Sequence, residues 1–325
     1  MDVILAYSSA LSLMSHIARN RSMPFSYEKK GNCSAGAIDA RTVSSLLKRF
    51  EHLERPLHLA VPSASSRRIL DSATFHQIAS LEAAGASWRI GNRLCVTSPA
   101  LCLAQFASSI PFENLAELAC SLAGNYRFAT SPNGSVVNAI PLTTLDEMSE
   151  TLASVATLRG RAKALRATEF AIGNLGSPFE TVLYLLLCLP RKHGGFGFPK
   201  PLANPELEPS SFLQSRVSQR HFYPDLLWPE HGVIVEYDGE RAHSETKQMF
   251  QDARRRNELG LLGYSVIVVT KQIIYSQQLM ANTAEQLRRA MGLSAWKITA
   301  SWQERHRTLR NNLLHRPAPL SVYWR

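Results

Sequence analysis

The sequence lacks a long apolar run and lacks closely spaced cysteines. Its longest apolar run, residues 182–189, is far shorter than the roughly 20 residues that a membrane-spanning helix needs. The five cysteines include no CxxC pair, which excludes a compact zinc knuckle, and their odd number and dilution predict reduced thiols. Met1-Asp2 brings an early acid in place of the basic start of a signal peptide. We therefore predict a soluble, cytoplasmic protein with no membrane partner.

Acidic residues are in short supply relative to basic ones. The chain has 26 Asp and Glu against 36 Lys and Arg, a net charge of +10. Basic side chains that neutralise phosphates release condensed counterions, so this balance favours a polyanionic partner, although an indifferent basic surface gives the same count. A hydrophobic content of 45% indicates packed structure, and 325 residues are enough for two domains.

The N-terminal half has the pattern of a mixed α+β domain. The residues predict a short helix from position 8, a helix over 39–54, a strand over 57–61, a hairpin over 88–96, a helix from Ser98-Pro99 and a turn at Asn133-Gly134. Residues 144–174 predict a basic helix with Arg159, Lys163 and Arg166 on one face. This face is either solvated or a phosphate-binding stripe, with solvation favoured.

The pattern changes after a break at residues 173–176. Predicted elements there are a helix over 177–189, a strand near Phe198, paired strands over 221–228 and 232–239, a helix over 244–262, a strand over 264–270 and a helix over 273–291. This order predicts a mixed sheet flanked by helices. We divide the chain into an α+β domain with a basic helical linker (1–175), a second domain (176–293) and a basic tail (294–325).

Carboxylates converge in the paired strands. A turn at 229–232 pairs Trp228 with Val233 and places Asp225 opposite Glu236, and alternation puts Asp238 on the same face as Glu236. Carboxylates this close repel one another unless a cation compensates them. Oxygen ligands of this kind suit Mg²⁺ or Mn²⁺, so all three acids are candidate metal ligands and catalytic residues.

Two further residues are candidates for the catalytic site. His243 follows the second strand closely and is positioned to act as a general base or proton shuttle; a surface loop histidine is the alternative. Glu180 completes a capping box with Ser177, and it could also face the metal from its helix.

Basic and amide side chains near these acids are candidates for phosphate contact. They are Lys247, Arg254, Arg255, Arg256 and Gln272. An i, i+4 salt bridge between Asp252 and Arg256 is the structural alternative for Arg256, and a helix cap is the alternative at Thr270 or Gln272. The tail, with five arginines and three aromatic residues from position 302, fits either nucleic-acid contact or a helix packed on the N-terminal domain.

At these residues the chain resembles a known family. Pro224-Asp225, the segment VEYDG at 235–239, His243 and the segment 251–270 resemble endonuclease-like domains related to the very-short-patch repair endonuclease, in the PD-(D/E)XK superfamily. In this resemblance Asp225 matches the PD element and Glu236 the following acid. Residues 57–68 and 93–107 are similar to the middle domain of bacterial AbiEi-type antitoxin or regulator-like proteins, which implies defence or mobile-element biology.

The chain departs from these families in three ways. Asp238 stands where the superfamily has a catalytic Lys; the repair subgroup uses histidine there, so His243, Lys200 or Lys247 is the candidate substitute. The winged helix that precedes the AbiEi-like region in relatives, and the zinc-binding cysteines of the repair enzymes, have no counterpart.

We therefore expect an α/β chain of the mixed-sheet α+β kind, with a smaller N-terminal α+β domain before a restriction-endonuclease-like domain. The expected activity is that of a Mg²⁺-dependent endodeoxyribonuclease, a phosphodiester hydrolase acting on DNA, with RNA as an open alternative substrate. The alternative function is a catalytically inactive, antitoxin-like or regulatory module that binds nucleic acid or a partner protein. A homodimer is also compatible with the sequence.

Overall fold

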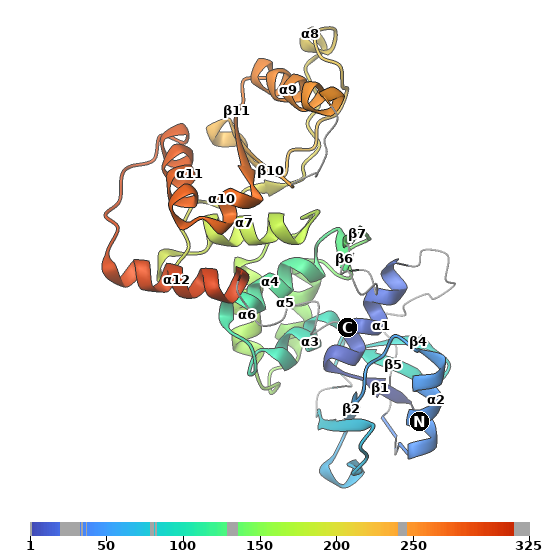
Figure 1. Ribbon diagram of the computed structural model, residues 1–325. Coiled ribbons are helices and arrows are strands. Elements are labelled where there is room, and N and C mark those ends of the chain that lie inside the picture. The colour runs from blue at the N-terminus through green and yellow to red at the C-terminus, as the bar shows by residue number, and fades with distance from the viewer. Residues whose placement is uncertain are drawn as a thin grey trace. The chain divides into compact units, whose positions relative to one another are not determined.

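A computed structural model of the chain describes residues 2–19, 33, 35–36, 38–78, 81, 83–128, 136–239 and 246–314 (Figure 1). Helices and strands alternate along the chain, and its larger sheets contain both parallel and antiparallel pairs. This confirms the predicted α+β class. The chain divides into two compact units between Gly173 and Asn174, and the first unit is the longer one, not the smaller one expected. Within the described ranges, none of the helices combines the length and apolarity needed to cross a membrane.

The first unit contains a five-stranded sheet in the order β3-β2-β1-β5-β4 and a separate β6-β7 pair. Its strands are β1 (Val3–Leu5), β2 (Leu57–Val61), β3 (Ala73–Gln77), β4 (Ser87–Gly91), β5 (Leu94–Thr97), β6 (Tyr126–Phe128) and β7 (Val136–Asn138). Its helices are α1 (Tyr7–Arg19), α2 (Ala40–Arg49), the 3₁₀ turn η1 (Ala64–Ser66), α3 (Pro99–Phe106), α4 (Phe112–Leu122), α5 (Leu145–Ser154) and α6 (Arg161–Phe170).

Several local signals in this unit act as predicted. Asp39 caps α2 by accepting a hydrogen bond from the Thr42 backbone N–H, and Ser98 caps α3, which has Pro99 in its first turn. The predicted strand at 57–61 is confirmed as β2, and the predicted hairpin is formed by β4 and β5. The predicted turn at Asn133-Gly134 lies outside the described residues.

The basic helix predicted over residues 144–174 is wrong as a single element. It is broken between α5 and α6, where Gly160 has φ +87° and packs so tightly that a Cβ would lie 2.3 Å from the Ala104 carbonyl oxygen. Lys163 Nζ donates to the carbonyl oxygens of Ala107 and Ile110, at 2.8 and 2.6 Å. The guanidinium of Arg166 lies 5.5 Å from the centre of the Phe112 ring. Both cations therefore make contacts within their own unit.

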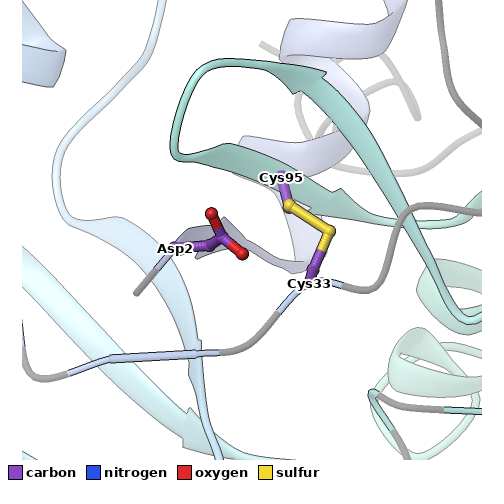
Figure 2. A group of neighbouring side chains, drawn as sticks. All are labelled: Asp2, Cys33 and Cys95. Atoms are coloured by element: carbon purple, nitrogen blue, oxygen red, sulfur yellow. A yellow bond between two sulfur atoms is a disulfide. The ribbon is translucent and has the colours of Figure 1, made fainter.

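A disulfide between Cys33 and Cys95 contradicts the prediction that the thiols are reduced (Figure 2). The segment around Cys33 lies beside β1 through an Asp2–Ala35 bridge, and β1 pairs Ile4 with Cys95. Sheet pairing thus joins cysteines that are 62 residues apart in the sequence, a distance over which spacing carries no signal. Cys102, Cys120 and Cys188 are buried thiols.

The second unit contains a four-stranded sheet in the order β11-β10-β9-β8, with β10 and β11 parallel and the other pairs antiparallel. Its strands are β8 (Leu202–Ala203), β9 (Leu226–Trp228), β10 (Val233–Asp238) and β11 (Ser265–Thr270). Its helices are α7 (Pro178–Cys188), η2 (Arg191–His193), α8 (Ser211–Gln214), η3 (Pro229–His231), α9 (Thr246–Leu261), α10 (Lys271–Tyr275), α11 (Gln277–Ala290) and α12 (Ala300–Leu314).

Helices cover both faces of this sheet, as Figure 1 shows for α7 and α9. Ile234 packs in one cluster with Leu227 and with Leu259 of α9. Tyr237 points to the opposite face because side chains alternate, and its ring stacks on Phe179 of α7 at a centroid distance of 5.2 Å. The predicted mixed sheet with flanking helices is therefore confirmed.

Three predicted elements of this unit differ in the structure. Phe198 is not in a strand, and the nearby strand is β8. The strand predicted over 221–228 is reduced to β9, and Phe222 makes an isolated bridge to Leu207. The last predicted helix is divided into α10 and α11 at Ser276, whose side chain caps α11.

Residues 300–314, predicted within the basic tail, form α12 and belong to the second unit. Trp302 and His306 are buried, and they contact the carbonyl oxygens of Gly195 and Gly194 through Nε1 and Nδ1, at 3.0 and 2.7 Å. Arg310 donates to the carbonyl oxygen of Tyr275 at 2.9 Å. These side chains hold the helix in place.

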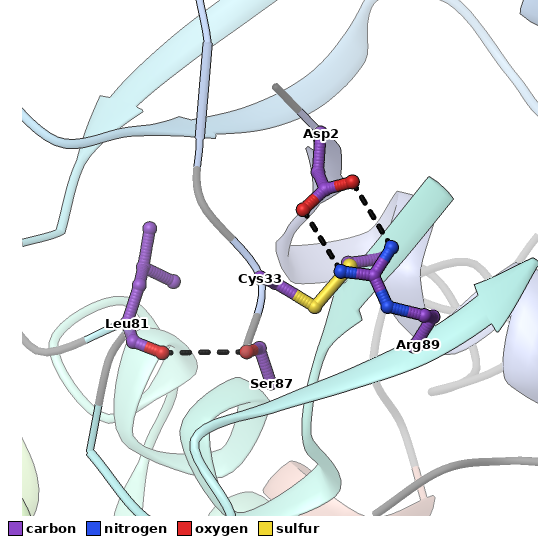
Figure 3. The surroundings of a disulfide bond; sticks show 6 residues. Asp2, Cys33, Leu81, Ser87 and Arg89 are labelled. Carbon is purple, nitrogen blue, oxygen red and sulfur yellow. Dashed lines mark hydrogen bonds and ion pairs between the residues drawn. A yellow bond between two sulfur atoms is a disulfide. The ribbon is translucent and has the colours of Figure 1, made fainter. Parts of the chain in front are cut away.

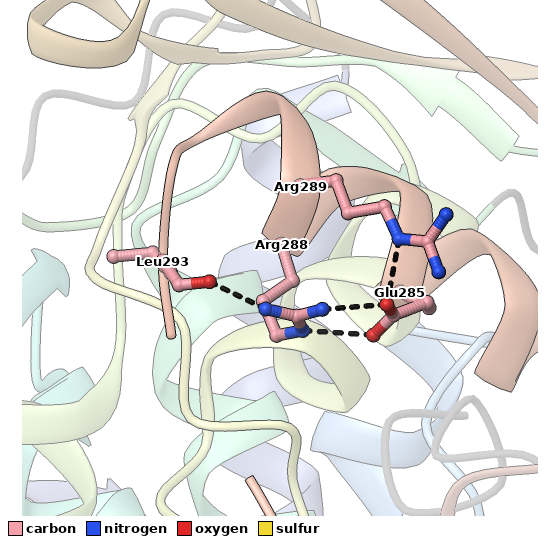
Figure 4. A network of polar contacts seen from close by, with 4 residues as sticks. All are labelled: Glu285, Arg288, Arg289 and Leu293. Atoms are coloured by element: carbon pink, nitrogen blue, oxygen red, sulfur yellow. Dashed lines mark hydrogen bonds and ion pairs between the residues drawn. The ribbon is translucent and has the colours of Figure 1, made fainter. Parts of the chain in front are cut away.

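Ion pairs of Glu285 with Arg288 and Arg289 lie at the carboxyl end of α11 (Figure 4). Glu285 accepts from Arg288 Nη2 at 2.5 Å and from Arg289 Nε at 2.8 Å. Arg288 also donates to the Leu293 carbonyl oxygen, which fixes the path of the chain after the helix. These contacts lower the pKa of Glu285 to about 2.

We expect non-reduced, denatured protein to expose three thiols and reduced protein five, because Cys33 and Cys95 are joined. Replacing both by serine should destabilise the first unit, by up to about 4 kcal/mol from loop-closure entropy alone. Thiol titration and urea unfolding measure the two effects. A Cys120→Ser variant is the control for the thiol count, and five reactive thiols without reductant would contradict the pairing.

Candidate carboxylate site

Asp225 and Glu236 meet across the β9–β10 hairpin. Val233 pairs with Trp228 and Ile234 with Leu227, as the sequence predicts, and the same register continued by one residue sets Glu236 opposite Asp225. The Tyr237 backbone N–H donates to Asp225 Oδ2 at 2.6 Å. Strand pairing therefore holds the Asp225 carboxylate against the backbone of β10, the strand that carries Glu236.

Glu180 joins them from the first turn of α7. The Ser177 hydroxyl accepts from the Glu180 N–H at 3.1 Å, which is the predicted cap. The reciprocal contact is different: Glu180 Oε2 accepts from the Gly176 N–H at 2.7 Å and from Asn204 Nδ2 at 2.9 Å. Glu180 is thus a buried acid that is hydrogen-bonded at the start of α7 and contributes charge near Asp225.

Burial and mutual repulsion dominate the electrostatics of this group. The pKa of Asp225 is raised to about 8 by burial and then by the charges of Glu180 and Glu236, against the opposing Tyr237 N–H and Arg255. Burial likewise raises the pKa of Glu236, although Arg255 opposes the shift. The raised pKa of Asp225 indicates that a positive charge added beside it, besides that of Arg255, would be strongly stabilised.

Arg255 supplies positive charge to the site from α9. Its Nη2 donates to Glu236 Oε1 at 3.2 Å and to the Tyr223 carbonyl oxygen at 2.9 Å, and its guanidinium lies 6.0 Å from the Phe222 ring centre. The side chains of Arg255 and Glu236 are 28% and 18% exposed, so the pair is only partly screened by water. The sequence predicts a phosphate contact for Arg255; in the structure this side chain is paired with the Glu236 carboxylate.

The other predicted catalytic residues lie differently. Asp238 is exposed at the end of β10, opposite Thr270 of β11. His243 lies outside the described residues, and so does the side chain of Lys247. The structure therefore brings Asp225, Glu236 and Glu180 together and leaves Asp238 at the surface.

The remaining predicted phosphate contacts lie on α9 and α10. Arg254 Nε donates to the buried Glu258 at 2.9 Å, while Arg256 and Gln272 are exposed. The Asp252 side chain lies outside the described part, so the salt bridge expected with Arg256 is not described. Thr270 caps α10 through the Ile273 N–H.

Sequence reasoning missed Asn204, which links Glu180 to the strand of Asp225. Besides its bond to Glu180, its backbone N–H donates to the Asp225 carbonyl oxygen at 3.1 Å, and its φ is +46°. Asn tolerates this conformation better than most residues. The Asn204-Pro205 dipeptide is a turn signal, but it carries no indication of a site.

Asp225, Glu236 and Glu180 do not form a compact set of metal ligands. In the described part of the chain, two groups have three potential ligand atoms all within 4.8 Å of one another: Asp2 with the disulfide cysteines, and the exposed Glu206, Glu208 and His221. The set at Asp225 is more open than these, and Arg255 holds Glu236. Sequence reasoning also missed the Glu206 group, whose members come from two segments joined by the Leu207–Phe222 bridge.

No protein-family model matches the chain, and comparison with curated proteins and with solved structures found no match.

We expect Asp225→Asn to change the pH dependence of stability, measured by urea unfolding in EDTA. The folded carboxyl keeps its proton up to about pH 8, whereas the unfolded one ionises near 3.8. Its contribution to stability is present below the lower pKa and is lost as pH rises toward the higher one, at most about 1.4 kcal/mol per pH unit. The stability of the Asp225→Asn variant relative to the parent should therefore increase as the pH rises from about 3.8 to about 8.

Asp238→Asn is the matched control, because this exposed carboxylate lies on the same hairpin. The difference in stability between this variant and the parent should stay nearly constant with pH. If the Asp225→Asn difference is equally constant, the proposed burial of Asp225 near other negative charges is wrong.

Proposed function

We propose that the second unit is a divalent-metal-dependent nuclease that hydrolyses phosphodiester bonds, with DNA as the favoured substrate. The observation that carries the proposal is the hairpin register that sets Asp225 opposite Glu236 beside the buried Glu180. Glu180 is buried and Asp225 and Glu236 are half-buried, and carboxylates in such places that repel one another destabilise a fold unless a cation compensates them.

The donor set fits a hard divalent ion. Carboxylate oxygens are the ligands that Mg²⁺ and Mn²⁺ prefer, and an open set leaves positions for water and for a substrate phosphate. A positive ion beside Asp225 would displace the proton that this carboxyl group holds up to about pH 8. Metal affinity should therefore increase as the pH rises toward that value.

When bound, the ion supplies Lewis-acid polarisation of the phosphate and lowers the pKa of coordinated water. Asp225 and Glu236 would hold it; the Tyr237 N–H orients Asp225, and Glu180 adds negative charge from α7. Asn204 fixes Glu180 relative to β9. Proton transfer is assigned to His243 from the sequence alone, because that residue lies outside the described part.

Arg255 is the residue that we assign to the substrate phosphate. Its guanidinium already lies beside the carboxylates, and its planar set of donors suits a phosphate oxygen. A metal ion bound by Glu236 would compete with Arg255 for that carboxylate, leaving the guanidinium for the substrate. The exposed Arg256 and Gln272 and the anchored Arg254, together with Lys247, are proposed to contact the flanking backbone.

The resemblance to very-short-patch repair and AbiEi-type proteins leads us to propose a role in bacterial defence or mobile-element biology. The regulatory alternative shares the same fold and differs in chemistry. In that case the carboxylates would hold no metal. The pairing of Glu236 with Arg255 and the hydrogen bonds to Asp225 and Glu180 would be their compensation.

We expect the purified protein to nick or linearise supercoiled plasmid with Mg²⁺ or Mn²⁺ and not with EDTA. Asp225→Asn and Glu236→Gln should each reduce the rate by at least about a hundredfold, since they remove metal ligands. Glu206→Gln combined with Glu208→Gln is the control, because it removes the other carboxylate pair.

Full cleavage by the Asp225→Asn variant would contradict the proposed site, and loss of cleavage in the control would move the site to Glu206 and Glu208. Tight metal-independent DNA binding without cleavage would favour the regulatory alternative.

Removing the guanidinium of Arg255 should have opposite effects on metal affinity and on the rate of cleavage. We expect Arg255→Gln to bind Mn²⁺ about tenfold more tightly, on the order of 1.4 kcal/mol, because a nearby positive charge is lost. Cleavage at saturating metal should fall. Calorimetric titration measures the first effect, Arg256→Gln is the control, and weaker Mn²⁺ binding by Arg255→Gln would contradict the arrangement.

A further inference from the structure

A basic hollow of about 530 Å³ lies on the first unit, far along the chain from the carboxylate site. It is bounded by the start of β1, by one side of α2 and by the turn between β4 and β5. The side chains that matter here are Arg41, Thr42, Ser45, Arg49, Asn92 and Arg93. Figure 1 shows α2 beside the sheet strands in this part of the molecule.

Three arginines give this hollow its charge. Arg41, Ser45 and Arg49 are spaced by four residues, so they lie along one side of α2. Arg93 is placed by the hairpin turn, where its φ is +59°. All three guanidinium groups are exposed, and none of them forms an ion pair with a carboxylate of the described residues.

The acid in the hollow is already neutralised. Asp2 lines the cavity, but both of its oxygens accept from Arg89, Oδ1 from Nη1 and Oδ2 from Nη2, each at 3.0 Å (Figure 3). Asp39, at the start of α2, is occupied as a helix cap by Thr42, whose hydroxyl donates to it at 2.6 Å. Arg41 still lies close enough to Asp39 to help lower the pKa of that carboxyl, and the guanidinium of Arg49 lies 5.1 Å from the centre of the Phe50 ring. The hollow nevertheless carries more positive than negative charge, because Asp2 is paired with Arg89.

The walls of the hollow are fixed by contacts outside the arginines. The Gly36 N–H donates to the Asp2 carbonyl oxygen at 3.1 Å, and Cys33 is bonded to Cys95 of β5. Val3 donates through its N–H to the Arg93 carbonyl oxygen at 2.9 Å, which ties the turn to β1. These contacts fix the backbone that carries Arg93 relative to β1.

We propose that this hollow binds the phosphodiester backbone of a nucleic acid. Guanidinium groups pair with phosphate through two parallel hydrogen bonds, and Ser45 and Asn92 offer further donors. Arg41 and Arg49 are separated by about 12 Å along the helix axis, a distance greater than a single phosphate group can span. The spacing therefore favours a chain of phosphates over one free phosphate ion.

This site does not rest on the proposed nuclease chemistry, because it uses none of the carboxylates of the second unit. Its role would be to hold nucleic acid through backbone contacts that carry no base sequence. Such contacts release counterions, so their number can be read from the dependence of affinity on salt.

The test measures binding of a fluorescein-labelled DNA duplex to the full chain by anisotropy, in EDTA, over a series of salt concentrations. The test variant combines Arg41→Gln, Arg49→Gln and Arg93→Gln. The control combines Lys48→Gln, Arg67→Gln and Arg68→Gln, which removes the same charge from exposed positions outside the hollow. Thermal unfolding verifies that both variants are folded.

We expect the test variant to lose at least about tenfold in affinity, and its slope of log K against log salt to become smaller by about 2 to 3, from roughly 0.9 per phosphate contact. The control should bind almost like the parent. Replacing the same three arginines by lysine should restore most of the slope, because it returns the charge.

Equal loss in the test and control variants would overturn the proposal, since net charge alone would then explain binding. Unchanged binding by the test variant would also overturn it. If inorganic phosphate binds at the hollow by calorimetry and the variants do not affect the duplex, the site takes a free anion and the proposal is wrong. Because the assay is run in EDTA, it reports binding with no metal-dependent cleavage, which separates this test from that of the nuclease.

Discussion

The antiparallel register of β9 and β10 is the constraint on which the second unit depends. Trp228, Leu227 and Leu226 pair with Val233, Ile234 and Val235, and all six side chains are buried. A shift by one residue would move Ile234 from the α9 face to the α7 face. Apolar packing therefore selects the register, and Glu236 and Asp225 follow from it.

The cost of this register is a set of acids in a poorly hydrated place. The protein offsets the charge only in part, with the Tyr237 and Gly176 N–H groups, the Asn204 amide and Arg255. Asp225 keeps a pKa of about 8 despite this support. Perturbed pKa values of this kind cluster at functional sites, and the proposed metal site rests on this group of acids.

Positive charge is distributed differently in the two units. In the first unit Lys163 and Arg166 make contacts within the fold, whereas Arg41, Arg49 and Arg93 face a hollow. In the second unit Arg255 compensates an acid and Arg310 holds α12 in place. The net charge of +10 thus does not locate a binding surface, because the partners of each cation decide whether it is available to a phosphate.

Local patterns in the sequence were sufficient for many of the helices and strands and for the β9–β10 hairpin. Alternation and a tight turn predict the pairing of Trp228 with Val233, and cap residues predict the starts of α3 and α7. These signals act over a few residues, where covalent geometry and side-chain hydrogen bonds limit the conformations. The order of helices and strands likewise predicts a mixed sheet covered by helices.

The tertiary structure alone decided which distant residues meet. Glu180 reaches the carboxylates through the packing of α7, Arg255 through α9, and Asn204 through the β8–β9 pairing. The same holds for the Cys33–Cys95 disulfide and for the breaking of the basic helix at Gly160 against α3. Contacts between residues remote in sequence depend on how buried surfaces fit together, and a single sequence determines that fit without displaying it in any local pattern.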